Sequence, residues 1–290
     1  AIYLTLLGTD SVIFGGGVSL ADLQFTRVEG TKDLLISING TQDSLLIKNQ
    51  FDGRMMDLFG FFGVQWFDRV ENFVFADGSR IDWETILAIV TTGGDGDDWL
   101  AGDFYADTLN GGAGNDYMNG GDEGDTYLFG RGDGQDIIED TPGFVIGPEP
   151  DQLVFKAGVA VGDVIFSRDP ASDDLIVSIA GTTDQVRIKN QFVVTETGVF
   201  GTIAMNQVEQ FRWADGTVKS FSTIVADLIA ASSTAGDDTI RGWHFDDVIV
   251  GGTGNDLMKG GNGSDVYVFN RGDGADVIVE WMPTALAARE

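Results

Sequence analysis

The stretch GGAGNDYMNGGDEGDTYLF, residues 111–129, decides how this chain folds. Glycines interrupt it every few positions, and four carboxylates are scattered through it with no basic residue to balance them: Asp116, Asp122, Glu123 and Asp125. Such a composition is typical of a solvated acidic linker. A linker has no reason to hold apolar residues at a constant phase, so spacing distinguishes a linker from a folded site.

Aspartates recur every nine residues through this region, and an apolar residue follows each of them two positions later. The aspartates are Asp98, Asp107, Asp116 and Asp125, and then Asp238, Asp247, Asp256 and Asp265. The apolar residues are Leu100, Leu109, Met118 and Tyr127, and then Ile240, Ile249, Met258 and Tyr267. All eight positions keep the register, which argues against a linker.

Glycines keep the same register. Four segments read G-G-x-G-x-D-x-apolar-x, at residues 93–101, 111–119, 251–259 and 260–268. A further turn follows each run after a two-residue insertion, at residues 131–139 and 271–279, and contributes Asp136 and Asp276. Glycine lets such a turn bend through positive φ and bring carbonyl oxygens close together.

Turns of this kind stack along an axis, with one apolar side chain per repeat pointing inward. Carbonyls and carboxylates of neighbouring turns then converge on one spot. A cavity of six or more oxygens suits Ca²⁺, whose oxygen ligands lie at about 2.3–2.6 Å, and is too large for Mg²⁺.

The composition agrees with a cation partner. The chain has 290 residues, 46 acidic against 17 basic, and a net charge of −29, which repels nucleic acid and anionic membranes. It has no cysteine and one histidine, so oxygen ligands are the metal chemistry left. No apolar run approaches the roughly 18 residues that cross a bilayer. The first residues, AIYLTLLGTD, lack the features of a secretory signal, so we expect either another export route or a longer parent chain.

The chain is a tandem duplication. Residues 33–51 return at 174–192, and residues 70–79 return at 208–217, displaced by 141 and 138 positions. The Gly/Asp block returns after 140. We therefore expect strand-rich units at 1–90 and 141–231, rolls at 91–140 and 232–280, and a tail at 281–290.

Each strand-rich unit alternates short β-branched or aromatic runs with Gly, Asn and Asp turns, which predicts antiparallel strands and hairpins. A short helical pattern closes each unit, at residues 82–90 and 221–230. Asp82 and Ser222 are the predicted N-caps of these helices.

The Gly/Asp repeats resemble the RTX, or haemolysin-type calcium-binding, family. The resemblance implies a right-handed parallel β-roll with several calcium ions per roll. It also implies that backbone carbonyls come from the second and fourth repeat positions and a carboxylate from the sixth. Those positions are Gly94, Gly96 and Asp98; Gly112, Gly114 and Asp116; Gly252, Gly254 and Asp256; Gly261, Gly263 and Asp265. The candidate ligands also include Asp107, Asp125, Asp238 and Asp247, and, in the last turns, Gly132, Gly134, Asp136, Gly272, Gly274 and Asp276.

The strand-rich units are similar to the related domain that accompanies RTX repeats in large secreted proteins. The shared motifs are DxLxF at Asp151, Leu153 and Phe155, the IKNQF run, and VExFxxADG. We interpret the acids of the last motif as turn and register devices: Glu71, Asp77, Glu209 and Asp215.

Two features depart from the repeat pattern. The second repeat of each run replaces its second and fourth glycines, with aromatic residues alongside, and Glu123 takes a glycine position in the fourth repeat of copy one. Two interpretations of the aromatic residues stay open, a cover for the roll against the strand-rich unit, which we favour, and a sugar-stacking platform: Phe104, Tyr105, Trp243 and Phe245. His244 is interpreted as a surface residue.

The sequence thus predicts an all-β chain in which calcium-binding β-rolls alternate with strand-rich units that carry a short helix. We expect a calcium-binding structural region of a large secreted or surface RTX protein, an adhesin-like stalk that folds on extracellular calcium. The resemblance implies type I secretion. The alternative is an accessory module of a secreted protease, lipase or polysaccharide epimerase whose catalytic domain lies elsewhere.

Within this chain we expect no enzyme activity, because it has no nucleophile elbow, phosphate loop or histidine pair. The expected partner is calcium, with copies of itself or a cell-surface or polysaccharide ligand as further candidates. Nucleic-acid binding and membrane insertion are not expected.

Overall fold

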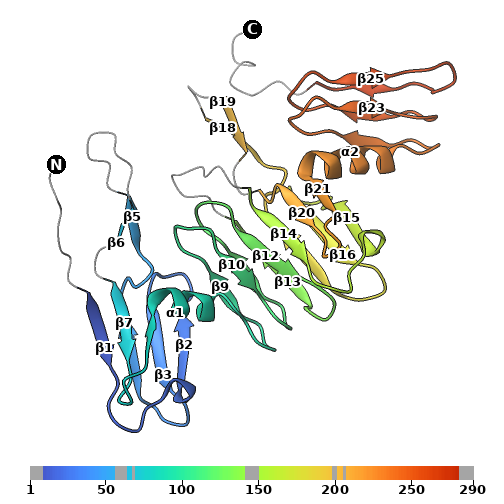
Figure 1. Ribbon diagram of the computed structural model, residues 1–290. Helices are drawn as coiled ribbons and strands as arrows, with labels where there is room; N and C mark the ends of the chain where they lie inside the picture. Colours follow the sequence, from blue (N-terminus) through green and yellow to red (C-terminus); the bar gives the residue numbers. More distant parts are fainter. Residues whose placement is uncertain are drawn as a thin grey trace.

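A computed structural model describes residues 9–55, 64–66, 69–140, 150–197, 201–204 and 207–280. Its regular structure is almost entirely β-strand, with two short α-helices among the described residues. Figure 1 shows the two copies following one another, each with a strand-rich unit and then a roll. The predicted all-β class, with parallel β-rolls, is confirmed. The predicted tail at 281–290 lies outside the described residues.

The strand-rich unit of copy one contains two small sheets and a separate hairpin. One sheet has the order β1-β7-β8, with β1 parallel to β7, and the other is the antiparallel β2-β3-β4; β5 and β6 form the hairpin. The bounds are β1 Asp10–Ile13, β2 Leu23–Arg27, β3 Leu34–Ile38, β4 Ser44–Ile47, β5 Gly53–Met55, β6 Val64–Trp66, β7 Val70–Val74 and β8 Arg80–Asp82. A 3₁₀ turn, Leu20–Asp22, precedes β2.

Copy two repeats this topology. The orders β14-β20-β21 and β15-β16-β17 reproduce the two sheets of copy one, and β18 and β19 reproduce the hairpin. The bounds are β14 Gln152–Phe155, β15 Val164–Arg168, β16 Leu175–Ile179, β17 Gln185–Ile188, β18 Val194–Thr197, β19 Gly201–Ala204, β20 Gln210–Arg212 and β21 Val218–Ser220. A 3₁₀ turn, Val161–Asp163, precedes β15.

The rolls are parallel solenoids. Alternate strands share a sheet, so Tyr117 of β11 pairs with Trp99 of β9, eighteen residues earlier. The inward residues Leu109, Met118 and Tyr127 are fully buried between the two sheets. The bounds are β9 Trp99–Ala101, β10 Thr108–Asn110, β11 Tyr117–Asn119, β12 Thr126–Phe129 and β13 Gln135–Ile138 in roll one, and β22 Thr239–Arg241, β23 Val248–Val250, β24 Leu257–Lys259, β25 Val266–Val268 and β26 Val277–Ile278 in roll two.

Roll one continues into the strand-rich unit of copy two. Strand β12 pairs in parallel with β14, and β13 pairs in parallel with β17. The result is a five-stranded sheet, β10-β12-β14-β20-β21, and a six-stranded sheet, β15-β16-β17-β13-β11-β9. One hydrophobic core runs from Leu100 of roll one through this unit to Met258 of roll two. The strand-rich unit of copy one has a separate core.

A short helix ends each strand-rich unit. Helix α1 (Trp83–Val90) is N-capped by Asp82, whose carboxylate accepts the Thr85 N–H at 3.0 Å, as predicted. Helix α2 (Phe221–Ser232) contacts β22 and β23 at the start of roll two. The predicted cap Ser222 is wrong: the helix begins at Phe221, and the Ser220 hydroxyl accepts the Thr223 N–H at 3.2 Å.

Candidate calcium sites in the two rolls

In the repeat at residues 111–119 the turns lie so close together that only glycine fits at the second and fourth positions. A Cβ at Gly112 would lie 2.1 Å from the Gly94 carbonyl oxygen, and one at Gly114 would lie 2.5 Å from that of Gly96. Both glycines have positive φ. Roll two packs the same positions in the same way, at Gly252, Gly254, Gly261 and Gly263. These six glycines therefore lie against the preceding coil, whereas a Cβ at Gly94, Gly96, Gly132 or Gly272 would have nothing within 4 Å.

The in-register aspartates form a ladder along each sheet of the roll. One carboxylate oxygen, Oδ1, accepts the backbone N–H of the aspartate two repeats earlier, which is one full coil of the solenoid. Asp116 accepts from Asp98 at 2.8 Å, and Asp256 accepts from Asp238 at 2.9 Å. The other accepting aspartates are Asp125, Asp136, Asp265 and Asp276. The nine-residue sequence register is thus a hydrogen-bond register.

The second oxygen of these six carboxylates, Oδ2, is buried and has no hydrogen-bond partner within the described residues. The six are Asp116, Asp125, Asp136, Asp256, Asp265 and Asp276. An unpaired buried carboxylate oxygen is costly, and buried charges are normally paired or coordinate a metal. These atoms fit a cation better than they fit the protein alone.

Four predicted ligands behave differently. They belong to the first two turns of each roll, where Oδ2 accepts an N–H from the aspartate's own turn, four residues earlier. Asp98 accepts from Gly94 at 2.8 Å, and Asp238 accepts from Thr234 at 2.7 Å. Asp107 and Asp247 follow the same pattern. These oxygens already have a donor, so the structure separates the predicted aspartates into two groups.

Burial raises the pKa of six of the in-register aspartate carboxyls. It raises the pKa of Asp107 and of Asp136 to about 7 and that of Asp125 to about 9, against a lowering effect of the backbone N–H that each accepts. The pKa values of Asp116, Asp247 and Asp265 are raised for the same reason. Neighbouring carboxylates add to the rise in each case. A bound cation would remove this penalty on the ionised form.

The last turns of the two rolls differ. In roll one the Asp184 carboxylate of the following strand-rich unit accepts the Gly132 N–H at 2.8 Å and the Gly134 N–H at 3.2 Å. The glycines themselves pack alike in both rolls: a Cβ at Gly134 or Gly274 would lie 1.9 or 1.6 Å from the carbonyl oxygen of Gly114 or Gly254, and one at Gly132 or Gly272 would have nothing within 4 Å. The difference between the two final turns is therefore the Asp184 carboxylate.

Sequence reasoning missed that the ladder continues past the repeats. Asp151 Oδ1 accepts the Asp125 N–H at 2.6 Å, and Glu209 Oε2 accepts the Asp151 N–H at 2.8 Å. Asp140, buried beside them, accepts the Tyr127 hydroxyl at 3.0 Å. Glu71 likewise accepts the Asp10 N–H in copy one, so both glutamates of VExFxxADG do set strand register. The DxLxF aspartate, aligned with the repeats, was the available signal.

A second, outer ladder was also missed. At the fifth repeat position, Asp97 accepts the Asn115 N–H at 2.8 Å and Asn115 accepts the Gln135 N–H at 3.1 Å. Asp237 and Asp246 do the same in roll two. The fifth position is polar in every regular repeat, but it varies among Asp, Asn and Ser. The repeat pattern G-G-x-G-x-D therefore places no requirement on it.

The departures from the repeat have structural consequences. Glu123 adopts a φ of +64°, the left-handed backbone that glycine would supply without strain. Trp243 is buried against Phe192 and Phe221, as expected of a cover over the roll, whereas Tyr105 and Phe245 are exposed. His244 is half-buried next to Trp243.

The donor set is made of oxygens alone. Across the described residues, no three Asp, Glu or His side chains gather around one point. A cation in these rolls would accordingly take part of its coordination from backbone carbonyls, as the stacked turns allow.

A parallel solenoid whose turns bring together carbonyl and carboxylate oxygens is a calcium-binding β-roll. Residues 92–127 and 245–278 match the RTX calcium-binding nonapeptide repeat (4 copies). Residues 33–85 and 174–220 match the haemolysin-type calcium binding protein related domain. The chain belongs to the RTX family of calcium-binding repeat proteins. A comparison with curated proteins gave no match. Among the described residues, no helix is long and apolar enough to span a membrane.

Proposed function

We propose that this chain is a calcium-stapled structural region of a large secreted or surface protein, in which the rolls fold on extracellular calcium and form a stiff stalk. The observation that carries the proposal is the set of six buried Oδ2 atoms that have no partner among the described residues. These oxygens recur at one per turn through the last three turns of each roll, so the sites would be an array rather than a single centre.

Calcium binding and folding are coupled in this proposal. Without calcium, the ladder carboxylates repel one another and the glycine-rich coil buries little apolar surface against its large ordering entropy. Since the site exists only in the folded roll, the free energy of binding becomes free energy of folding. Extracellular calcium modules bind with Kd of about 10⁻⁴–10⁻³ M. Rolls of this affinity would stay unfolded in a low-calcium cytosol and fold outside the cell.

The stalk is supported by the junction between roll one and copy two. Phe129 and Ile138 of roll one and Val186 of copy two are each 0% exposed there. Their counterparts at the outer ends of the two copies are Phe269, Ile278 and Leu45, which are 63%, 49% and 41% exposed. Further copies joined by the same junction would cover these residues and lengthen the rod.

Circular dichroism during a calcium titration tests the coupling. We expect a cooperative gain of β signal that a chelator reverses, with several ions bound per chain by equilibrium dialysis. A β signal that is the same in excess chelator and in calcium would contradict the proposal. Cooperative folding without secretion of the parent protein would leave the calcium site standing and overturn only the extracellular role.

A further inference from the structure

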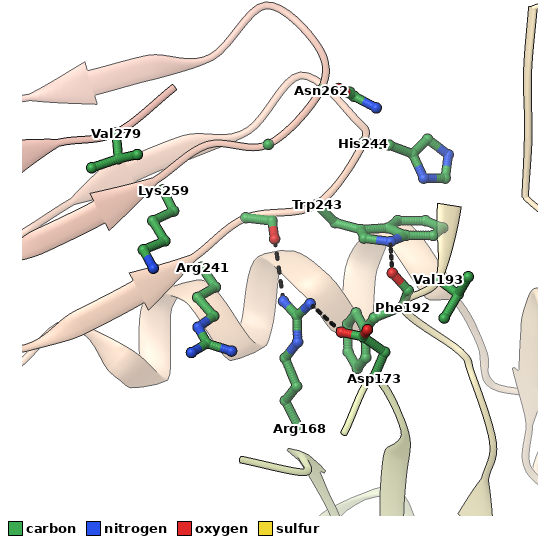
Figure 2. Close-up of a pocket in the computed structure, with 12 residues that line it drawn as sticks. Arg168, Asp173, Phe192, Val193, Arg241, Trp243, His244, Lys259, Asn262 and Val279 are labelled. Atoms are coloured by element: carbon green, nitrogen blue, oxygen red, sulfur yellow. Dashed lines mark hydrogen bonds and ion pairs between the residues drawn. The ribbon is translucent and has the colours of Figure 1, made fainter. Parts of the chain in front are cut away.

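A cavity of about 550 Å³ lies between the strand-rich unit of copy two and roll two. Figure 2 shows three basic side chains along one side of it and aromatic side chains along the other. The basic residues are Arg168, at the end of β15, Arg241, at the end of β22, and Lys259, at the end of β24. Three of the 17 basic residues of the chain thus share one cavity.

The positive charge of this cavity is not balanced by its own residues. The Arg168 guanidinium lies 3.5 Å from the Asp173 carboxylate and donates to the Gly242 carbonyl at 3.3 Å. Arg241 and Lys259 are direct neighbours on parallel strands, a like-charge pair. Among the described residues, neither of them has an acidic partner. Three cations face one carboxylate, in a chain whose net charge is −29.

Copy one provides an internal comparison, because it has the corresponding cavity, of about 280 Å³. Arg27, the counterpart of Arg168, donates to the carbonyls of Ala101 and Gly102 and lies over the Phe51 ring. Arg168 lies over Phe192 in the same way. The contact between this arginine and the roll is therefore structural in both copies.

The other two cations have no such role. Ala101 and Asn119 stand in copy one where copy two has Arg241 and Lys259, and the same strands form around them. Asp103 and Asp122 also line the copy-one cavity, beside two basic residues. The fold does not need the extra positive charge of copy two, so that charge requires another explanation.

We propose that the copy-two cavity binds an oxyanion, the carboxylate, sulfate or phosphate group of a small ligand. Arg241 and Lys259 would donate to its oxygens, and Arg168, which lines the same cavity, would add positive charge. Hydrogen bonds of this kind, between ionised groups, are about twice as strong as neutral ones. The His244 Nδ1, buried and without a partner in the described structure, and the Asn262 amide lie on the rim and supply further polar contacts.

The test is a calorimetric titration of the full chain at fixed, saturating free calcium. The probes are sulfate and glucuronate, with glucose as the neutral control. We expect saturable binding of at least one anion and none of glucose. The variant Arg241→Ala with Lys259→Asn installs the copy-one residues, and we expect it to weaken binding on the order of 10-fold or more. The affinity of the single variant Lys259→Asn for the anion should lie between those of the unchanged chain and the double variant.

A matched control separates a site from general charge. The variant Arg80→Ala with Arg212→Ala removes the same charge from two exposed hairpin positions outside the cavity. It should bind the anion like the unchanged chain. Absence of anion binding, equal losses in the two double variants, or equal binding of glucose would each overturn the proposal. Binding of sulfate without glucuronate, or the reverse, would identify which oxyanion the cavity accepts. A negative result in these titrations would overturn the anion site alone, because neither calcium binding nor the stalk depends on it.

Discussion

At the residue scale, the aspartates of the repeat do two different jobs. In the first two turns of each roll, the Oδ2 atom of the aspartate accepts a backbone N–H of its own turn, as Asp238 does from Thr234. Further along, one oxygen joins the ladder and the other stays without a donor, as with Asp256. Nonapeptide repeats that look equal in sequence are therefore expected to contribute unequally to calcium binding.

Asp256→Asn should raise the calcium concentration at the folding midpoint on the order of 10-fold, because ligand charge tunes calcium affinity. The amide oxygen can still accept the Asp238 N–H, so the ladder is kept while the free oxygen is lost. Asp238→Asn is the matched control, and we expect a shift of less than about 3-fold. Circular dichroism in calcium titrations measures both. Equal shifts would contradict the division into two groups.

Gly114→Ala should destabilise the calcium-saturated chain by about 3 kcal/mol, because the new Cβ meets the Gly96 carbonyl at 2.5 Å and φ is +147°. Gly162→Ala is the control, with nothing within 4 Å of its Cβ, and should change stability by less than about 1 kcal/mol. Urea denaturation in calcium compares the two. A neutral Gly114→Ala would mean that the turns are not stacked this closely.

At the scale of the elements, local sequence predicted the repeat but not its surroundings. The strands of the rolls follow from the nine-residue phase, and the helix at Trp83–Val90 follows from its apolar period and its Asp82 cap. The cap of the second helix was misplaced by two residues, because Ser220 and Ser222 are equally good caps in isolation. What no local pattern encodes is the pairing of β13 with β17, whose partners are 50 residues apart.

The candidate site was predicted to a similar degree. The aspartates and glycines could be placed by register alone. The division of the aspartates into two groups could not be predicted, because it depends on whether a preceding coil of the roll donates an N–H to each carboxylate. Asp184 was missed because it reaches Gly132 and Gly134 from another unit. Its side chain completes a turn whose repeat lies some 50 residues earlier.

Asp184→Ala should destabilise the calcium-saturated chain by about 1–3 kcal/mol, because two N–H groups of the last turn of roll one lose their acceptor. Asp215→Ala, which removes the acceptor of an exposed Thr217 N–H in a hairpin turn, should cost less than about 1 kcal/mol. Thermal unfolding in calcium reports the difference. If both variants unfold alike, Asp184 does not close the roll.

At the scale of the whole molecule, the roll and the strand-rich unit that follows it form one continuous pair of sheets. The two sheets cross from roll one into copy two, and the core crosses with them. Figure 1 shows this central region between the copy-one strand-rich unit and roll two. A stalk built in this way would transmit stiffness through its junctions.

Phe129→Ala should destabilise the chain by about 3–5 kcal/mol, since this side chain is fully buried at the junction. Phe269→Ala, at the same position of roll two, should cost less than about 1 kcal/mol, because 63% of that side chain is exposed. Denaturation in calcium compares the pair directly. Similar losses of stability in both variants would contradict the burial of Phe129 at the junction.

Hydrogen exchange of the full chain, measured residue by residue in calcium and in chelator, tests the coupling of folding to calcium most directly. The ladder amides donate to carboxylates of the next coil, for instance Asp98 to Asp116 and Asp238 to Asp256. Residues 92–138 and 233–278 should be protected in calcium and should exchange freely once it is removed. Equal protection of these segments in both conditions would show that the rolls fold without calcium.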